Sequence, residues 1–249
     1  MTEKPKHGPS VAKTIWHWRK EKSARDGFFP MLTCLFATLW EFARESTPSR
    51  RRQRYGDVDY DWDYRVDTTS ATVDWRSRLL GMFHSPYQPT EPTLFREMLA
   101  SLTQARPTID FREFIFLDIG AGKGRALLLA ADYPFRRILG IELLPELRRV
   151  AVENIARYKS DSQRCFAVDC LLGDAVDFPF PPEPTVLYLF NPLPQAGLIR
   201  MIGNLERSLE EHPRPVFVIY HNPLLEPVLA RSAFKRIAGT PQYSIYSNL

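Results

Sequence analysis

The chain has 249 residues, of which 44% are hydrophobic and 25% are charged, and this composition excludes a fibrous or intrinsically disordered protein. Its three cysteines, Cys34, Cys165 and Cys170, are an odd number without metal-ligand spacing, so neither a disulfide framework nor a zinc site is expected. The net charge of +4 is uneven, because residues 1–55 carry 12 Lys/Arg against 5 Asp/Glu, a balance of +7, which leaves −3 for the remainder.

Residues 1–55 are predicted to form a basic, amphipathic helical extension. Ser10 can cap a first helix, and Pro30 can open a second one whose apolar residues recur every three or four positions. The apolar run over 28–43 is shorter than the roughly 20 residues that span a bilayer and contains Glu41, so no membrane span is predicted. The positive charge suits a polyanion or a membrane surface, and a solvated face is the alternative.

The chain starts with polar and basic residues and lacks the apolar core and cleavage site of a secretory signal. Together with the cysteine usage, this favours a cytoplasmic location. Peripheral contact with a membrane through residues 1–55 is the second reading of the same charge pattern.

Residues 56–110 are predicted to connect the extension to the next domain and to act in part as a lid. The stretch "DVDYDWDYRVDTTSAT" has no sustained periodicity and is rich in turn formers, which indicates a long connection. In "SPYQPTEPTLFREMLASL", Thr90 or Thr93 is expected to start a helix that runs toward Leu102.

From residue 111 onward, short apolar runs alternate with amphipathic segments, a pattern typical of an α/β domain over 111–249. Strands are predicted over 114–118, 137–141, 165–171, 185–190, 215–220, 233–239 and 243–248, and helices over 123–133, 145–158, 195–211 and 224–231. Right-handed crossovers then give a doubly wound, seven-stranded, mostly parallel sheet. The last two strands are joined only by "TPQ" and are expected to form an antiparallel hairpin at the sheet edge.

The first predicted strand runs into "LDIGAGKGR", in which Asp118 precedes Gly120, Gly122 and Gly124. In an open α/β sheet, the turn after the first strand is the usual place for a ligand. The G-x-G-x-G spacing is neither the G-x-G-x-x-G of dinucleotide sites nor a P-loop, which needs a longer spacer and a Lys-Ser/Thr pair. A carboxylate at position 118 repels a pyrophosphate and attracts a cation, so the pattern favours a cationic ligand.

This pattern resembles motif I of class I, seven-strand S-adenosylmethionine-dependent methyltransferases, and the resemblance extends over 111–249. It implies S-adenosyl-L-methionine as the cofactor and S-adenosyl-L-homocysteine as the product. The implied cofactor turn consists of Asp118, Gly120, Ala121, Gly122 and Gly124.

The same resemblance implies two further cofactor contacts. Glu142, at the end of the second strand, would accept hydrogen bonds from the ribose hydroxyls, and capping of the next helix is its alternative role. Asp174 matches the position that contacts the adenine amino group, and an ordinary solvated turn aspartate is the alternative.

The fourth strand ends in "LFNPLP", where this family places a polar residue and a proline beside the transferable methyl group. The side-chain carbonyl of Asn191 and the backbone carbonyl of Pro192 would accept hydrogen bonds from an incoming amine, although Asn191 is also a common turn former before proline. Leu193 departs from the N-P-P-[FY] pattern, which argues against stacking on a nucleobase. His221 is the best-placed general base, with a structural role as its alternative.

A closer resemblance rests on "RVDTTSAT", "YQPTEPTLFREML", "FLDIGAGKGRALLLAA", "GIEL" and "LFNPLP" in this order. They look like a bacterial group of class I methyltransferases with mostly unassigned substrates. The turn is also similar to that of seven-strand protein lysine methyltransferases, in which a segment ahead of the first strand folds over the cofactor. This implies a lid at "SPYQPT" with Tyr87 and Thr90 as cofactor contacts.

The predicted function is therefore methyl transfer from S-adenosylmethionine to a protein amine or a small molecule, with no metal. Nucleic acid is disfavoured as the acceptor because the basic residues lie in the extension and residues 56–249 carry a net charge of −3. A nicotinamide-dependent oxidoreductase and a catalytically silent cofactor-binding adaptor are the alternatives.

Overall fold

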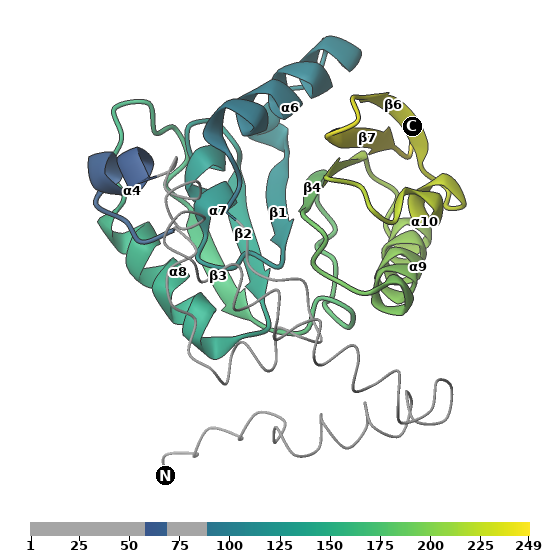
Figure 1. Ribbon diagram of the computed structural model, residues 1–249. Coiled ribbons are helices and arrows are strands. Elements are labelled where there is room, and N and C mark those ends of the chain that lie inside the picture. Colours follow the sequence, from purple (N-terminus) through teal and green to yellow (C-terminus); the bar gives the residue numbers. More distant parts are fainter. Residues whose placement is uncertain (1–57, 69–88) are drawn as a thin grey trace, which may run out of the picture. The chain divides into compact units, whose positions relative to one another are not determined.

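The computed structural model describes residues 58–68 and 89–249 (Figure 1). The chain divides into two units, Met1–Gly56 and Asp57–Leu249, and every described residue belongs to the second.

Two of the sequence-based expectations lie outside the described residues. These are the helical extension over 1–55 and the lid residue Tyr87. The boundary between a connecting segment over 56–110 and a domain over 111–249 also stays a prediction.

Seven strands form one sheet in the order β3-β2-β1-β4-β5-β7-β6. Their bounds are β1 Ile115–Ile119, β2 Arg137–Glu142, β3 Val168–Leu172, β4 Thr185–Leu189, β5 Val216–His221, β6 Lys235–Gly239 and β7 Tyr243–Ser247. The pairs among β1 to β5 are parallel, and β7 runs antiparallel to both β5 and β6. The predicted doubly wound, mostly parallel sheet with a C-terminal antiparallel hairpin is confirmed.

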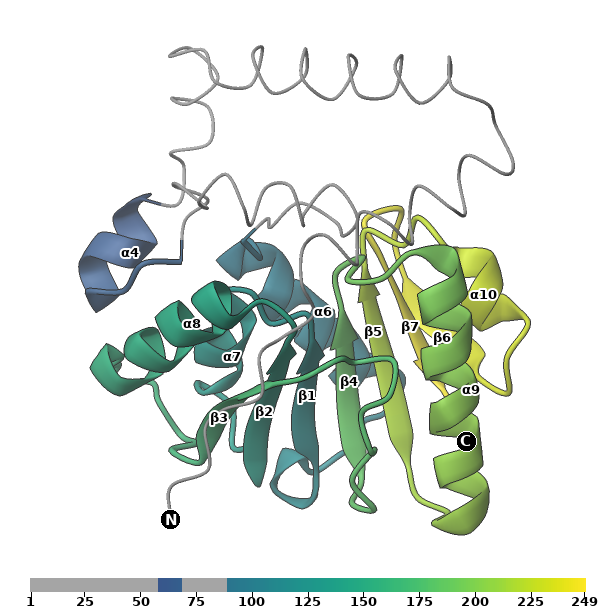
Figure 2. The ribbon, with the colours of Figure 1, turned by 90° about the horizontal axis from the view of Figure 1, so that it is seen from below.

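Helices cover both faces of this sheet. Their bounds are α4 Val58–Tyr64, α6 Pro92–Ala105, α7 Arg125–Ala130, α8 Pro145–Arg157, α9 Gln195–Glu211 and α10 Glu226–Ala230, with a 3-10 turn η2 over Phe111–Glu113. Residues of α6, α7 and α8 share one hydrophobic core, and those of α9 and α10 share the other (Figure 2).

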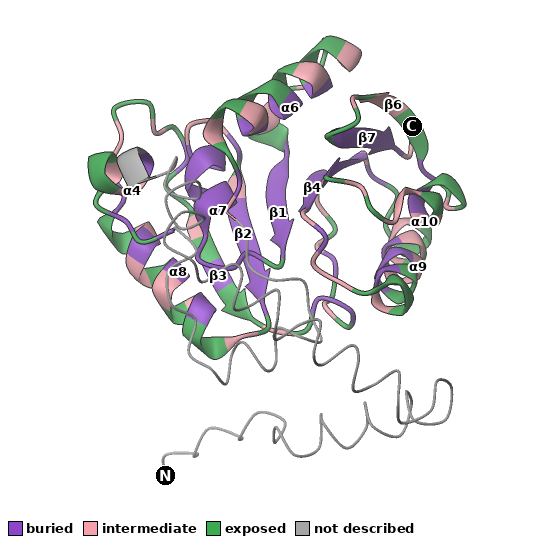
Figure 3. Ribbon diagram, viewed as in Figure 1, coloured by how far each residue is buried: buried purple, intermediate pink, exposed green. Residues whose placement is uncertain are grey.

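The strands β1, β4 and β5 are buried at every position (Figure 3). They appear in the sequence as continuous apolar runs because helices exclude water from both of their faces. The outer strands β3 and β6 are partly exposed. The centre of the sheet is thus shielded from water, and the carboxyl ends of β1, β2, β4 and β5 lie at the same end of the sheet.

The helix α6 begins at a different residue from the one expected. Its N-cap is Glu91, whose carboxylate accepts hydrogen bonds from the backbone N–H of Thr93 (2.9 Å) and of Leu94 (2.6 Å). A carboxylate satisfies two N–H groups at once, whereas a threonine hydroxyl satisfies one. Thr90 is instead buried beneath the helix start.

The segment expected to be an irregular connection contains the helix α4. Tyr60 and Tyr64 are four residues apart on it, and their ring centroids lie 4.7 Å apart. The ring of Tyr64 also lies 5.1 Å from that of Tyr158 in the loop after α8. Packing onto α8 therefore stabilises one short helix that has no sustained apolar period of its own.

Strand β3 begins at Val168, three residues later than expected. The backbone N–H groups of Arg164 and Cys165 both donate to the carbonyl of Ala131, which keeps this stretch out of the strand ladder. Cys165 and Phe166 are apolar, which favours a strand in the sequence pattern, but the hydrogen bonds to Ala131 determine the conformation of this stretch.

Gly140 lies in β2 beneath the turn that starts α7. A Cβ at this position would lie 2.7 Å from the Cβ of Ala121 and 2.8 Å from the Cδ1 of Leu127. We expect Gly140→Ala to lower the melting temperature by several degrees, because overpacking a core costs about 1–3 kcal/mol.

The matched control is Gly203→Ala on α9, where an added Cβ meets no atom within 4 Å. Alanine is favoured over glycine in a helix by about 1 kcal/mol, so this variant should melt higher than the wild type. Thermal unfolding of both variants decides the point, and a stabilised Gly140→Ala protein would contradict the packing.

Candidate active site

The turn between β1 and α7 has a backbone that requires glycine. Gly120, Gly122 and Gly124 have φ values of 78°, 57° and 86°. A Cβ on Gly120 would lie only 2.7 Å from the Cβ of Pro192, so the turn and the loop after β4 are in direct contact. The side chain of Ala121 is buried below this turn, and its N–H donates to the carbonyl of Ile141 (3.0 Å). The sequence therefore brings the predicted turn and the predicted Asn-Pro loop together.

Asp118 is the buried carboxylate at the end of β1, with 3% of its surface exposed. Within the described residues it accepts no hydrogen bond. Burial, and then the negative charge of Glu142, raise the pKa of Asp118 to about 8. In the empty site near pH 7 this group is therefore mostly protonated, and a bound cation would favour its ionised form.

Glu142 links the end of β2 to the glycine turn. Its Oε2 accepts from the N–H of Gly122 (2.7 Å) and its Oε1 from the N–H of Leu144 (2.8 Å). Burial raises the pKa of Glu142, while these backbone donors act in the opposite direction. Leu144 is the N-cap residue of α8, so Glu142 stabilises the start of this helix, which is the alternative role named in the sequence analysis. Glu142 also contacts the glycine turn through Gly122.

Asp174 lies in the loop after β3 and is exposed. Its Oδ1 accepts from the N–H of Val176 (2.9 Å), which is the geometry of an Asx turn. The preceding Gly173 donates its N–H to the carbonyl of Glu142 (3.0 Å), so this loop borders the site.

Thr90, Tyr188 and His221 form one buried chain of hydrogen bonds. The Tyr188 hydroxyl lies 2.9 Å from Thr90 Oγ1 and 2.7 Å from His221 Nδ1. The His221 ring stacks on Phe190, with centroids 3.8 Å apart. Burial lowers the pKa of His221 to about 4, so the ring is neutral near pH 7. A hydroxyl partner, an aromatic neighbour and a low pKa favour the structural role of this histidine.

Asn191 is held on both sides of its amide. Its Oδ1 accepts from the Tyr220 hydroxyl (2.9 Å), and its Nδ2 donates to the carbonyl of Asn222 (2.6 Å). Its φ of 46° lies in the left-handed region that asparagine tolerates. Asn191 is thus a turn former, and the same contacts fix its carbonyl oxygen, which retains a second lone pair.

Sequence reasoning missed several polar residues that organise the site. Tyr188 and Tyr220 lie in runs that look uniformly apolar, and their hydroxyls hold His221 and Asn191. Tyrosines near the carboxyl ends of buried strands could have indicated these contacts, because a buried hydroxyl needs a hydrogen-bond partner.

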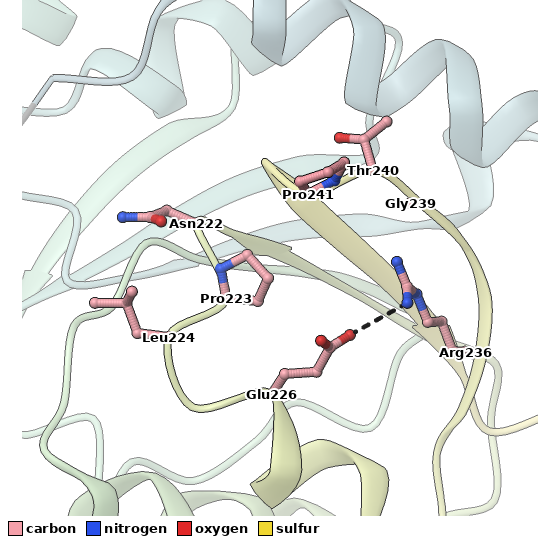
Figure 4. Close-up of a pocket in the computed structure, with 8 residues that line it drawn as sticks. All are labelled: Asn222, Pro223, Leu224, Glu226, Arg236, Gly239, Thr240 and Pro241. Carbon is pink, nitrogen blue, oxygen red and sulfur yellow. Dashed lines mark ion pairs between the residues drawn. The ribbon is translucent and has the colours of Figure 1, made fainter.

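A cavity of about 440 Å³ lies between the loop after β5 and the β6–β7 turn (Figure 4). Its lining residues are Asn222, Pro223, Leu224, Glu226, Arg236, Gly239, Thr240 and Pro241. Glu226 and Arg236 point toward one another and form an ion pair at 3.6 Å (Figure 4). Through Asn222 the cavity adjoins Asn191.

The described residues contain no group of His, Cys, Asp and Glu side chains that could hold a metal ion. Among the helices of those same stretches, none has the length and apolarity needed to cross a membrane.

Residues 117–189 match the family model described as a methyltransferase domain. This segment runs from β1 through β4 and contains the glycine turn, Glu142 and Asp174. No curated protein matches the chain in sequence.

Several solved structures are similar. An RNA methyltransferase from Salinibacter ruber in complex with S-adenosyl-L-homocysteine is 20% identical, covering 64% of this chain and 92% of that chain with a TM-score of 0.42. A ribosomal protein L11 methylase from Lactobacillus delbrueckii subsp. bulgaricus is 15% identical, with shares of 65% and 79% and a TM-score of 0.43. An N,N-8-amino-8-demethyl-D-riboflavin dimethyltransferase from Streptomyces davawensis is 14% identical, with shares of 83% and 60% and a TM-score of 0.45. Similarity at this level carries no information about the acceptor of this chain.

The raised pKa of Asp118 predicts a pH-dependent stability. A carboxyl group whose pKa is higher in the folded state than in the unfolded state destabilises the fold as pH rises from about 4 to about 8. Asp118→Asn removes this group, so the variant should melt above the cofactor-free wild type by about 4 °C or more at pH 8.

Melting temperatures at pH 5, 6.5 and 8 provide the measurement. The difference between the two proteins should grow with pH, whereas Asp110→Asn, which removes an exposed carboxylate, should show no such trend. A constant difference would mean that Asp118 titrates in its ordinary range.

Proposed function

We propose that the chain, whose residues 117–189 match the model of a methyltransferase domain, is a class I methyltransferase that transfers a methyl group from S-adenosylmethionine to an amine of a protein or a small molecule. The observation that carries the proposal is the pairing of a glycine turn with Asp118, a buried acid that accepts no hydrogen bond within the described residues and whose ionised form a cationic ligand would stabilise.

The residues present fit this cofactor. Asp118 is buried and accepts no hydrogen bond within the described residues, so an ammonium group would supply the missing partner. The turn at Gly120, Ala121, Gly122 and Gly124 presents backbone to the ligand. When bound, S-adenosylmethionine supplies a methyl group that is already activated by a positively charged sulfur.

Four further residues complete the proposed cofactor site. Glu142 accepts hydrogen bonds from the ribose hydroxyls through the lone pairs that Gly122 and Leu144 leave available. Asp174 accepts from the adenine amino group, with Tyr87 and Thr90 on the covering side. The buried position of Thr90 beside Tyr188 supports a location next to the end of β4.

Asn191 and Pro192 are the proposed acceptor-positioning residues. Tyr220 and Asn222 hold the Asn191 amide in one orientation, so its oxygen has a fixed direction in which to accept an N–H. The contact of Pro192 with Gly120 supports a location beside the cofactor turn. Methyl transfer then depends on orientation and on exclusion of water, with the nucleophile about 3–3.5 Å from the methyl carbon.

His221 is a weak candidate for a general base. A pKa of about 4 makes the ring a poor proton acceptor near pH 7, and its Nδ1 is already engaged by Tyr188. We therefore propose that His221 has a positioning role: it holds the Tyr188 hydroxyl in place, and Tyr188 in turn contacts Thr90. An amine that arrives unprotonated, or that loses its proton to water, needs no base from the chain.

The acceptor side extends toward the cavity beyond Asn222. Its volume of about 440 Å³ is in the range of small-molecule sites, and the rim prolines and Leu224 supply apolar contact. This supports an acceptor larger than the methylated group itself, resting against the loop after β5.

Cofactor binding is the first test. Calorimetry should detect S-adenosylhomocysteine and fail to detect NADH or NADPH, because the G-x-G-x-G turn lacks the G-x-G-x-x-G spacing of a dinucleotide site. Gly120→Val should abolish S-adenosylhomocysteine binding, since its side chain collides with Pro192. Binding of a nicotinamide dinucleotide alone would support the oxidoreductase and end the proposal.

Asn191→Gly tests the acceptor side. Glycine keeps the left-handed backbone and removes the amide, so the affinity for S-adenosylhomocysteine should change by less than about twofold. Transfer of labelled methyl groups to the protein or small-molecule fraction of a lysate should fall by about tenfold or more. Cofactor binding without any transfer by the wild type, in every fraction, would favour the silent adaptor.

A further inference from the structure

Residues 61–68, here called the acidic segment, dock on the glycine turn through its two cations. Lys123 Nζ donates to Asp67 (2.7 Å), and an Nη atom of Arg125 donates to Asp61 (3.2 Å). Arg125 Nε also donates to the Thr68 hydroxyl, and Thr68 in turn donates to Asp61. Among the contacts within the described residues, Lys123 and Arg125 each pair with an acid of a segment more than 50 residues away in the chain.

Asn154 on α8 joins the acidic segment to the turn. Its Oδ1 accepts from the N–H of Asp67 (2.8 Å), while its Nδ2 donates to the carbonyls of Asp67 (2.7 Å) and Lys123 (2.9 Å). The residue is fully buried. A single amide therefore fixes the backbone of the segment and that of the turn relative to each other.

The two cations are buried as deeply as core residues. Lys123 is 4% exposed and Arg125 is 1% exposed, and the Arg125 guanidinium lies 4.2 Å from the centre of the Tyr60 ring. Charges in such surroundings are weakly screened, so they act over long distances. Lys123 lies in the turn at which the proposed donor, itself a cation, must bind, and Arg125 follows that turn as the first residue of α7.

We propose that the acidic segment is an electrostatic counterweight, in which Asp61 and Asp67 offset the charges of Lys123 and Arg125 so that a donor with a positively charged sulfur can bind at the glycine turn. This inference rests on the proposed function, because it takes the ligand at the turn to be a donor with a positively charged sulfur. It makes Asp61 and Asp67 determinants of cofactor selectivity, although neither needs to touch the cofactor.

The test compares two ligands that differ in charge at sulfur. S-adenosylmethionine carries a positive sulfonium and S-adenosylhomocysteine a neutral thioether, so the ratio of their dissociation constants reports the local potential. Asp67→Asn removes a carboxylate that is itself more than half exposed but that lies 2.7 Å from the buried Lys123 Nζ, and the ratio of the S-adenosylmethionine constant to the S-adenosylhomocysteine constant should rise about twofold.

Removing a positive charge from the turn should change the ratio of the two dissociation constants in the opposite direction. Lys123→Met removes a positive charge from a buried position and should lower the same ratio. The double variant Asp67→Asn with Lys123→Met restores the local charge, so its ratio should return to that of the wild type. A merely structural role predicts that each change weakens both ligands equally and leaves the ratio unchanged.

Asp110→Asn is the matched control, because it removes one carboxylate from an exposed ion pair with Arg112 ahead of β1. Its ratio should equal that of the wild type. If both ligands bind but the ratio is the same in all variants, the counterweight is refuted and the proposed function stands. If neither ligand binds the wild type, the proposed function itself fails.

Discussion

The site depends on two carboxylates that are buried close together at the carboxyl ends of neighbouring strands. Asp118 is the next-to-last residue of β1 and Glu142 is the last residue of β2, and burial raises the pKa of both, so ionising either acid costs free energy in the empty site. Glu142 offsets this by accepting two backbone hydrogen bonds, whereas Asp118 has no such support in the described residues. The free-energy cost of an ionised, buried acid without a partner is therefore largest at Asp118, where the proposed cationic ligand would lower it.

The fold was predictable from the sequence because its signals are local. Continuous apolar runs identified β1, β4 and β5, and "TPQ" was too short for anything but a hairpin between β6 and β7. The errors occur where tertiary contacts override local preference. Ala131 draws residues 164–165 out of β3, and Tyr158 supports the helix α4.

The candidate site was predictable in part. The glycine spacing and the acids at strand ends point to the turn, since backbone conformation and charge are properties of individual residues. The tyrosine hydroxyls that hold His221 and Asn191 are different, because they arise from the pairing of β4 with β5. The contacts of Lys123 and Arg125 with the acidic segment likewise depend on residues far away in the chain, which no spacing rule relates.

The strand order has a consequence for how the sheet assembles. β6 is made before β7, yet it pairs with no strand other than β7 within the described residues. During synthesis, β6 therefore emerges without a partner, and β5 keeps one open flank until β7 arrives and satisfies both. β7 therefore completes the sheet by pairing with both strands. A nascent chain that stalls before β7 would expose an unpaired edge of β5 and an unpaired β6 to other molecules.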